Sequence, residues 1–250
     1  MALERVGRQV VLLTQIVGHI LGGGVDRGVT LTQMVNLGFN SIPIVLIVAG
    51  FAGMVFALHT TREFARFGAT ALAGQVLGIA MVRELSPVLT GIVMAARGGS
   101  AIAAEVGAMQ VTEQVDAMRA LAVDPVEYLV VPRFVSCTLM TPLLTIFANV
   151  LGLLGGCFVA ACQVGVSGRA FLESVNYFLS VGDLVAGILK ALIFGGIVAL
   201  IGCSRGFMTE GGAAGVGEST TGSVVSAIIT IFAVNYFLST VIFHDSVVAW

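Results

Sequence analysis

Long apolar stretches separated by short polar segments dominate the chain from residue 41 onward. Residues 41–58 and 222–243 carry no charge, and residues 134–163 carry none over thirty positions. Two further stretches are apolar apart from Arg83-Glu84 in one and Lys190 in the other. About 20 apolar residues are enough for a helix to cross a bilayer, so the pattern predicts five membrane-spanning helices. They cover roughly residues 41–61, 70–97, 133–163, 183–206 and 221–244.

Residues 3–20 follow a different period, with apolar residues at steps of three and four. Glu4, Arg5, Arg8 and Gln15 lie off the apolar face that these steps define. One apolar stripe beside a polar remainder is typical of an amphipathic helix that lies on a membrane surface. We therefore predict an interfacial helix in the region 1–38, before the first span. Its apolar face consists of Leu3, Val6, Val10, Leu13, Val17 and Ile20.

The longest polar segment runs from Arg97 to Arg133, between the second and third predicted spans. Within it, residues 101–122 contain no proline and one glycine, and their apolar positions have a helical spacing. Asp124-Pro125 follows, and a residue before proline avoids the helical conformation. This pattern predicts one short helix over 101–122. Together the elements predict an all-α integral membrane protein with a single domain over residues 1–250.

Composition and charge agree with membrane residence and give the spans an orientation. The chain is 57% hydrophobic and 10% charged, whereas soluble domains carry about 25% charged residues. Its net charge of −2 argues against a nucleic-acid partner. With the N-terminus in the cytoplasm, cytoplasmic segments carry seven arginines and outer segments three. Positive charge accumulates on the cytoplasmic side, so we expect the N-terminus inside, the C-terminus outside and the 97–133 segment in the cytoplasm.

Arg83 and Glu84 lie inside the second predicted span, where charges are costly and tend to mark function or internal pairing. Adjacent helical residues point about 100° apart, so each is expected to meet another helix, a water-filled cavity or a substrate headgroup. Pro87 cannot donate to the Arg83 carbonyl, which predicts a kink. The alternatives are side chains that reach the outer interface or serve packing alone. Lys190, inside the fourth span, either pairs with Glu84 or reaches the outer interface in the same way.

A ladder of small residues at steps of four also follows the second span. Small residues at this spacing allow two helices to approach closely. Packing within the chain and a seam between two copies of the chain both fit the pattern. The ladder consists of Gly91, Ala95, Gly99, Ala103 and Gly107.

The chain lacks the residues for ATP hydrolysis and offers weak candidates for other catalysis. A phosphate-binding loop needs a Gly-Lys pair, but Lys190 is the only lysine and Leu189 precedes it. The four cysteines lie in apolar segments without metal-ligand spacing, so we expect no metal site. With no catalytic constellation in the sequence, we also expect no catalytic residue and no cofactor bound by this chain. Residues 165–168 read G-V-S-G, which resembles the G-x-S-G of rhomboid proteases. Ser167 with His244 is therefore the candidate pair of a rival hypothesis, an intramembrane enzyme.

Four stretches of the chain resemble the MlaE/YrbE permease family, which includes the plastid lipid permease. Residues 97–133 read RGGSAIAAEVGAMQVTEQVDAMRALAVDPVEYLVVPR, a long and specific match to the family signature. Residues 82–87 match its R-E-L-x-P motif, residues 211–223 match its late glycine-rich loop with two threonines, and the last span resembles its C-terminal helix. The resemblance covers about residues 3–245. Asn235 departs from the family pattern, because many relatives carry an aspartate there.

The resemblance implies a homodimeric permease that binds a cytoplasmic ABC ATPase and associates with an MCE-domain substrate-binding protein. Such permeases move phospholipid or a related lipid between the inner membrane and the outer envelope, and ATP acts through the partner ATPase. No transit peptide precedes the interfacial helix, which favours a bacterial inner membrane over a plastid. A membrane scaffold that only recruits an ATPase is the second rival hypothesis.

The resemblance also implies roles for individual residues. The matching Arg83, Glu84 and Pro87 would line the lipid cavity, while the helix-packing role of Gly91, Ala95 and Gly99 comes from the small-residue spacing and not from the resemblance. The segment from Glu105 to Leu121 resembles the coupling helix that docks into the ATPase. Its coupling residues would be Glu105, Glu113, Gln114, Asp116 and Arg119.

Overall fold

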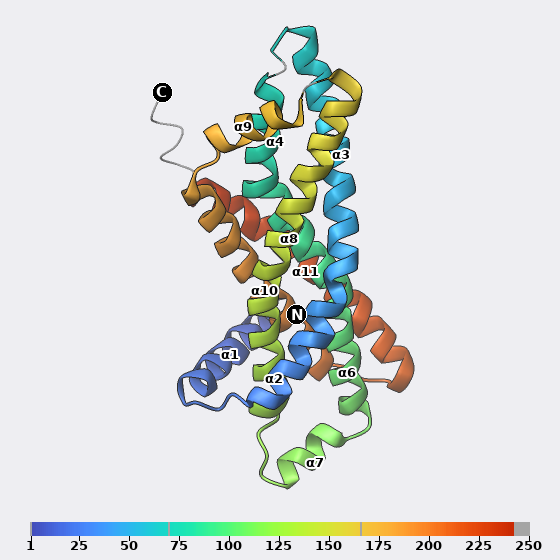
Figure 1. Cartoon of the computed structure of the whole chain (residues 1–250). Coiled ribbons are helices and arrows are strands. Elements are labelled where there is room, and N and C mark those ends of the chain that lie inside the picture. Colours follow the sequence, from blue (N-terminus) through green and yellow to red (C-terminus); the bar gives the residue numbers. More distant parts are fainter. Residues whose placement is uncertain (1, 70, 166, 243–250) are drawn as a thin grey trace. The chain divides into compact units, whose positions relative to one another are not determined.

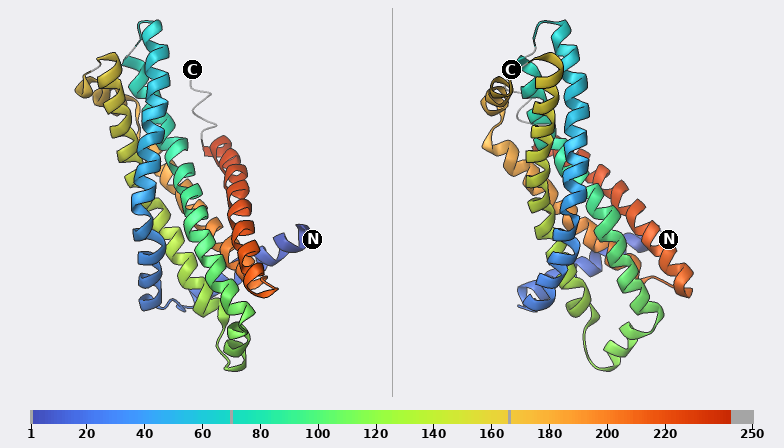
Figure 2. Two further views of the ribbon diagram at one scale, coloured as in Figure 1. Left: turned by 90° about the vertical axis from the view of Figure 1, so that its right-hand side faces the viewer. Right: turned by 45° about the vertical axis from the view of Figure 1, so that its right-hand side comes forward.

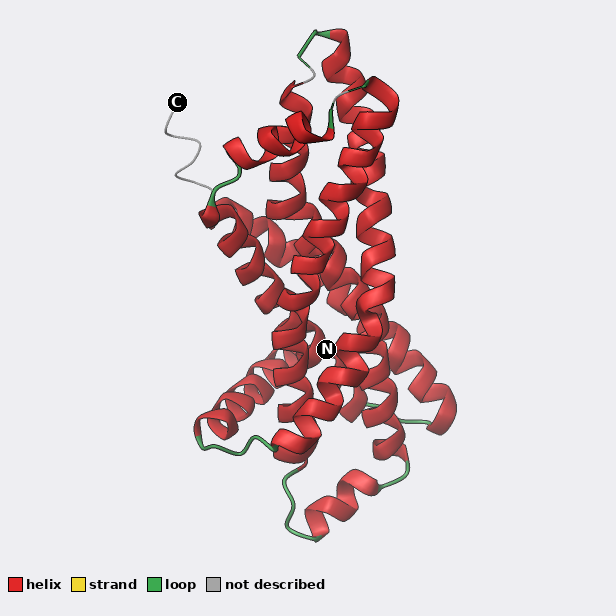
Figure 3. Ribbon diagram, viewed as in Figure 1, coloured by secondary structure: helices red, strands yellow, loops and turns green. Residues whose placement is uncertain are grey.

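The computed structural model describes residues 2–69, 71–165 and 167–242, and every regular element in them is helical (Figures 1 and 3). Within these described residues, five helical stretches are long and apolar enough to cross a membrane. Both the all-α prediction and the number of spans are therefore confirmed. The five stretches are Arg27–Arg66, Leu72–Val111, Val126–Gln163, Val181–Phe207 and Gly212–Ile242.

Several of these stretches are built from α-helices joined without a break through π-helical or 3₁₀ turns (Figure 2). The first three stretches contain such turns, which are labelled η. The elements up to the third stretch are α1 (Ala2–Leu21), α2 (Arg27–Gln33), η1 (Met34–Gly38), η2 (Phe39–Ser41), α3 (Ile42–Arg66), α4 (Ala71–Ala80), η3 (Met81–Leu85), α5 (Ser86–Met94), η4 (Ala95–Gly99), α6 (Ser100–Val111) and α7 (Gln114–Ala120). The remaining elements are η5 (Val126–Val130), α8 (Val131–Val164), α9 (Gly168–Phe178), α10 (Val181–Phe207) and α11 (Gly212–Ile242).

The single helix predicted over 101–122 is wrong, because the segment contains two helices. Its first half continues the second span as α6, and its second half is the separate helix α7. Between them Glu113 has a left-handed backbone, with φ of 59°, and a right-handed helix cannot pass through such a residue. The turn brings Val115 into a fully buried position. The helix does end before Asp124-Pro125, at a second left-handed residue, Ala122.

The chain forms two compact units, each assembled from segments far apart in sequence. The first contains Met1–Ser41, Gly91–Thr141 and Leu192–Phe237. The second contains Ile42–Thr90, Pro142–Ala191 and Leu238–Trp250. The helices α5, α8, α10 and α11 contribute residues to both units, so the division does not follow chain order.

Close helix contacts in the second unit depend on glycine. A Cβ atom on Gly53 of α3 would collide with the backbone of Gly152 of α8, and one on Gly152 would collide with the Met81 side chain. The neighbouring core places Leu77 and Met81 against Phe171 and Val175, so that α9 lies against α4 (Figure 1). The missing side chains let α3, α4 and α8 approach closely.

In the first unit the small-residue ladder faces helices of the same chain. A Cβ on Gly91 would lie 3.3 Å from the Phe194 ring and 3.4 Å from Ile231. A Cβ on Gly99 would lie 3.2 Å from Val198. The ladder therefore contacts α10 and α11, and Ala95 between the two glycines is fully buried. The sequence left two interpretations of the ladder, packing within the chain and a seam between two copies. The structure shows these glycines in contacts within the chain.

The α3–α8 contact predicts opposite outcomes for two glycines of one helix. Gly53→Ala adds a methyl group against the Gly152 backbone, so we expect the free energy of unfolding to fall by about 1–3 kcal/mol. Gly50→Ala, whose Cβ would meet nothing within 4 Å, should leave stability unchanged or slightly higher, because alanine favours helix. Unfolding of the detergent-solubilised chain measures both. Equal behaviour of the two variants would contradict the close contact.

Candidate functional site

The candidate site begins with an irregular turn in the second span. Residues Met81–Leu85 form the π-helical turn η3, and Pro87 follows in the first turn of α5. Pro87 has no N–H to donate to the Arg83 carbonyl, which would be its partner in a regular helix. The Lys190 ammonium group donates to that carbonyl instead, at 3.0 Å. The structure has a π-helical turn, a feature frequent at functional sites, just before the proline at which the sequence predicts a kink.

Lys190 is the centre of the site, and its side chain has no exposed surface. Its Nζ lies 2.7 Å from Glu84 Oε1 and 2.8 Å from the Ser239 hydroxyl oxygen. The Ser239 hydroxyl in turn donates to the same Glu84 oxygen at 2.8 Å. The pairing of Lys190 with Glu84, one of the two alternatives from sequence, is confirmed. A buried ammonium group needs such acceptors, because leaving water costs several kcal/mol.

Arg83 has a second carboxylate partner that sequence reasoning missed. Its Nε donates to Asp183 Oδ1 at 2.8 Å, and the Asp183 side chain is only 6% exposed. The other Asp183 oxygen accepts from the Ser180 amide and hydroxyl, both at 3.0 Å. The Ser180 hydroxyl also accepts from the Asp183 amide, at 3.2 Å. This reciprocal pattern is a capping box at the start of α10, and its spacing, S-x-x-D, was the available signal.

The two ion pairs are arranged alike, with one buried and one more accessible member each. Lys190 and Asp183 are 0% and 6% exposed, while Glu84 and Arg83 retain 39% and 26%. The four charges sum to zero. The site therefore offers one guanidinium and one carboxylate on adjacent residues, each held from behind by a buried partner. Such a site can contact a polar or zwitterionic group inside the membrane without leaving a buried charge unpaired.

Pro87 has a packing contact in addition to its backbone effect. A Cβ on Gly187 of α10 would lie 3.5 Å from Pro87 Cγ and would collide with the Val82 carbonyl. The α10 helix therefore approaches η3 and α5 closely, which brings Lys190 and Asp183 to the Arg83-Glu84 pair.

The residues expected to serve coupling lie in two places. Glu105, on α6, pairs with Arg133 of α8 at 2.8 Å. The Arg133 side chain is 8% exposed and also donates to the Leu129 carbonyl at 2.8 Å. Glu105 thus joins two helices inside the first unit, away from the α7 surface.

The other four coupling candidates lie on or beside α7, and all four are exposed. Glu113 forms the turn before the helix, and the Gln114 amide donates to the Thr112 hydroxyl at 3.0 Å. Asp116 and Arg119 form an exposed pair at 2.8 Å, one helical turn apart. Figure 1 shows α7 beyond the end of α6, and these four exposed polar residues therefore lie at this end of the first unit.

On the N-terminal helix α1, three residues of the predicted apolar face whose side chains are described, Val10, Leu13 and Val17, are exposed. Val10 and Val17 are 55% and 46% exposed, whereas Leu12 and Ile16 on the other side are 8% and 0% exposed. Near its end, His19 Nε2 lies 3.0 Å from Asp124 Oδ2. An outward apolar face is what a helix lying in a membrane surface requires.

The rival enzyme hypothesis depends on Ser167 and His244. The Ser167 hydroxyl accepts from the Ala170 amide at 3.3 Å and caps the start of α9. Serine is favoured at this position for that reason. His244 lies outside the described residues, as does Val166 of the G-V-S-G run. The structure thus gives Ser167 a capping role.

Five apolar helices with charged residues paired inside them define a multi-pass membrane protein. The family model described as Permease MlaE matches residues 30–241. The chain therefore belongs to the MlaE permease family, and it is a permease of an ABC transporter.

Relatives from several lineages agree with this assignment. The chain is 48% identical over 235 residues to a probable ABC transporter permease protein of Synechocystis, covering 94% of this chain and 89% of the relative. It is 40% identical to the chloroplastic protein TRIGALACTOSYLDIACYLGLYCEROL 1 of Arabidopsis thaliana, covering 94% of this chain and 67% of that protein. A probable ABC transporter permease protein of Rickettsia typhi is 38% identical, over 84% of this chain and 82% of the relative.

The Lys190–Glu84 pair predicts that Lys190→Met destabilises the protein, because it removes a partner of the Glu84 carboxylate. Removing one member of a fully buried ion pair costs about 3–5 kcal/mol, but Glu84 keeps 39% of its side chain exposed, so the free energy of unfolding in detergent should fall by less, about 1–3 kcal/mol. The double variant Glu84→Gln/Lys190→Met should be more stable than Lys190→Met alone. Glu63→Gln, in the exposed pair with Arg66, is the control and should change little. Strictly additive effects of the two substitutions would contradict the pairing.

Proposed function

We propose that this chain is the membrane-spanning subunit of an ABC transporter that moves phospholipid or a related lipid between the inner membrane and the outer envelope. The family match over residues 30–241 carries the proposal. The relative from Arabidopsis thaliana, which bears the name of a galactolipid, supports a lipid substrate. ATP is hydrolysed by a separate ABC ATPase, and this chain binds no cofactor of its own.

The lipid path runs past Arg83, Glu84 and Pro87. The accessible parts of Arg83 and Glu84 offer a guanidinium to a phosphate and a carboxylate to an amine or hydroxyl group of the headgroup. Lys190 and Asp183 hold the two side chains from behind, so they keep their orientation when a headgroup leaves. Charged residues inside spans commonly mark substrate pathways, which supports this assignment.

The α7 surface is where the ATPase docks. Glu113, Gln114, Asp116 and Arg119 are exposed there, and the buried Val115 anchors the helix beneath them. The Glu105–Arg133 pair joins α6 to the start of α8. Movement imposed on α7 would therefore reach the second and third spans through α6 and this pair.

The family resemblance supports an assembly of two copies of this chain with a cytoplasmic ABC ATPase and an MCE-domain substrate-binding protein. The excess of arginine on one side orients the chain in a bacterial inner membrane with the N-terminus inside and the C-terminus outside. In that orientation α1 and α7 both lie on the cytoplasmic side, where the ATPase is. The position of both helices on the cytoplasmic side supports a single face at which the ATPase docks.

Charge reversal on α7 should uncouple the two subunits. In Glu113→Lys/Asp116→Lys the exposed surface changes sign, so the ATPase should be stimulated several-fold less by the reconstituted permease. The residues are exposed and lie outside the core, so the variant should unfold at the same temperature as the unaltered chain. Glu173→Lys, an equally exposed carboxylate on α9, is the matched control and should stimulate normally. Normal stimulation by the double variant would contradict the docking assignment.

A further inference from the structure

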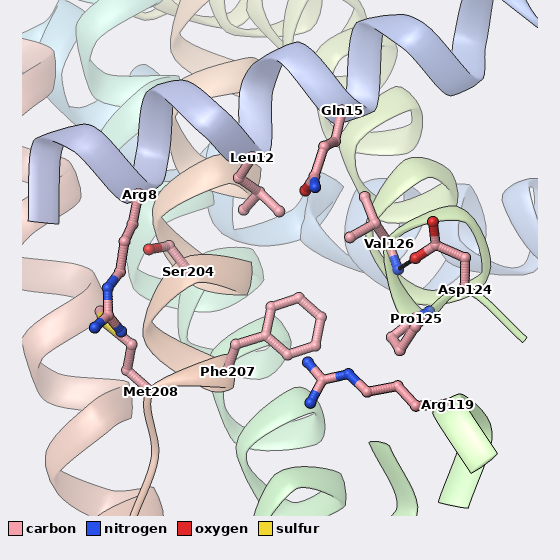
Figure 4. A pocket seen from close by; sticks show the side chains of 10 residues that line it. All are labelled: Arg8, Leu12, Gln15, Arg119, Asp124, Pro125, Val126, Ser204, Phe207 and Met208. Carbon is pink, nitrogen blue, oxygen red and sulfur yellow. Dashed lines mark hydrogen bonds between the residues drawn. The ribbon is translucent and has the colours of Figure 1, made fainter. Parts of the chain in front are cut away.

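A cavity of about 420 Å³ lies in the first unit, apart from the Arg83-Glu84 site. Three elements form its walls: α1, the last turn of α10, and the segment from α7 to η5 (Figure 4). Its volume is within the range of small-ligand sites. Its lining residues are Arg8, Leu12, Gln15, Arg119, Asp124, Pro125, Val126, Ser204, Phe207 and Met208.

Two arginines from distant parts of the chain give the cavity its charge. Figure 4 shows the Arg8 side chain entering from α1 and the Arg119 side chain entering from α7, with Phe207 between them in that view. A guanidinium carries five N–H donors in a planar fork, so Arg119 keeps donors available while one nitrogen contacts Asp116. Arginine guanidinium groups bind phosphate through charge-assisted hydrogen bonds.

The carboxylate in the lining, Asp124, is already engaged by protein groups. Its Oδ1 accepts from the Val126 amide at 2.8 Å, and its Oδ2 lies 3.0 Å from His19 Nε2. The lining itself holds two guanidinium groups and one carboxylate, which is already engaged, while Asp116, the partner of one Arg119 nitrogen, lies outside the lining. The cavity therefore favours an anion, and the apolar lining residues, among them Leu12 and Phe207, favour one that carries apolar atoms.

The position of α1 indicates where such an anion comes from. Arg8, Leu12 and Gln15 lie on the side of α1 that faces the cavity. Val10 and Val17 project from the opposite side and are exposed. A helix with this division lies in the surface of a bilayer, which places the cavity at the level of lipid headgroups.

We infer that this cavity binds the phosphate headgroup of an anionic glycerophospholipid, held between Arg8 of α1 and Arg119 of α7. The bound headgroup bridges the interfacial helix and the helix exposed beyond α6. The site is separate from the lipid path of the proposed function, and binding at the site does not require that function. Binding to this site is measured on this chain without an ATPase, so the headgroup site and the proposed transport function can fail independently.

Thermal unfolding of the full detergent-solubilised chain tests the inference. Dihexanoyl phosphatidylglycerol, titrated in, should raise the unfolding temperature of the unaltered chain and of the control Arg27→Gln, an exposed arginine outside the cavity. Arg8→Gln and Arg119→Gln should each need about tenfold or more lipid for the same shift, because a charge-assisted contact is lost. Arg8→Lys keeps the charge but not the planar guanidinium fork. The lipid concentration that it needs for the same shift should therefore lie between those of the unaltered chain and Arg8→Gln.

Inorganic phosphate at the same concentrations separates the two sources of the anion. A weaker effect than that of the lipid supports a lipid headgroup. An equal effect with the same dependence on Arg8 and Arg119 would assign the cavity to free phosphate and overturn the lipid source. Equal stabilisation of all variants by the lipid, or no stabilisation of the unaltered chain, would overturn the site.

Discussion

The buried ammonium group of Lys190 is the constraint on which the second compact unit depends. Its three acceptors come from two separate segments: the Arg83 carbonyl and the Glu84 carboxylate of η3, and the Ser239 hydroxyl of α11. The Arg83 carbonyl is an acceptor because Pro87 cannot use it. Since a buried charge without partners costs several kcal/mol, η3, α10 and the end of α11 must stay together around this one side chain.

The same constraint prepares the site for a ligand. Arg83 and Glu84 are neighbours in the chain, yet each pairs with a different, buried residue of α10. Their remaining exposed surface can meet a polar headgroup while the partners fix their direction. Stability and binding therefore share the same four charges, and the close contact of Gly187 with the η3 backbone makes the arrangement possible.

The features set by the membrane itself were predictable from sequence, and the contacts between helices were not. A helix needs a minimum apolar length to cross a bilayer, which made the five spans predictable from sequence, and the structure confirms their number. Periodicity does not identify the partner of a charged residue. Lys190 therefore kept two alternatives, pairing with Glu84 or reaching the outer interface, and Asp183, at the edge of its span, was missed as the partner of Arg83. The helix break at Glu113 could not be predicted, because no glycine or proline marks it in the sequence. The turn places Val115 in a buried position, and such burial depends on tertiary packing. The coupling and lipid-path residues stay predictions.

Transfer of a labelled phospholipid from proteoliposomes is the most direct test of the central claim, that this chain moves lipid when a partner hydrolyses ATP. The vesicles would hold the chain with its cognate ABC ATPase and MCE-domain protein, and acceptor vesicles would collect the lipid. The account predicts transfer that requires ATP and falls several-fold in Arg83→Gln while ATP is still hydrolysed. ATP hydrolysis without lipid transfer by the unaltered chain would contradict it and would favour a scaffold.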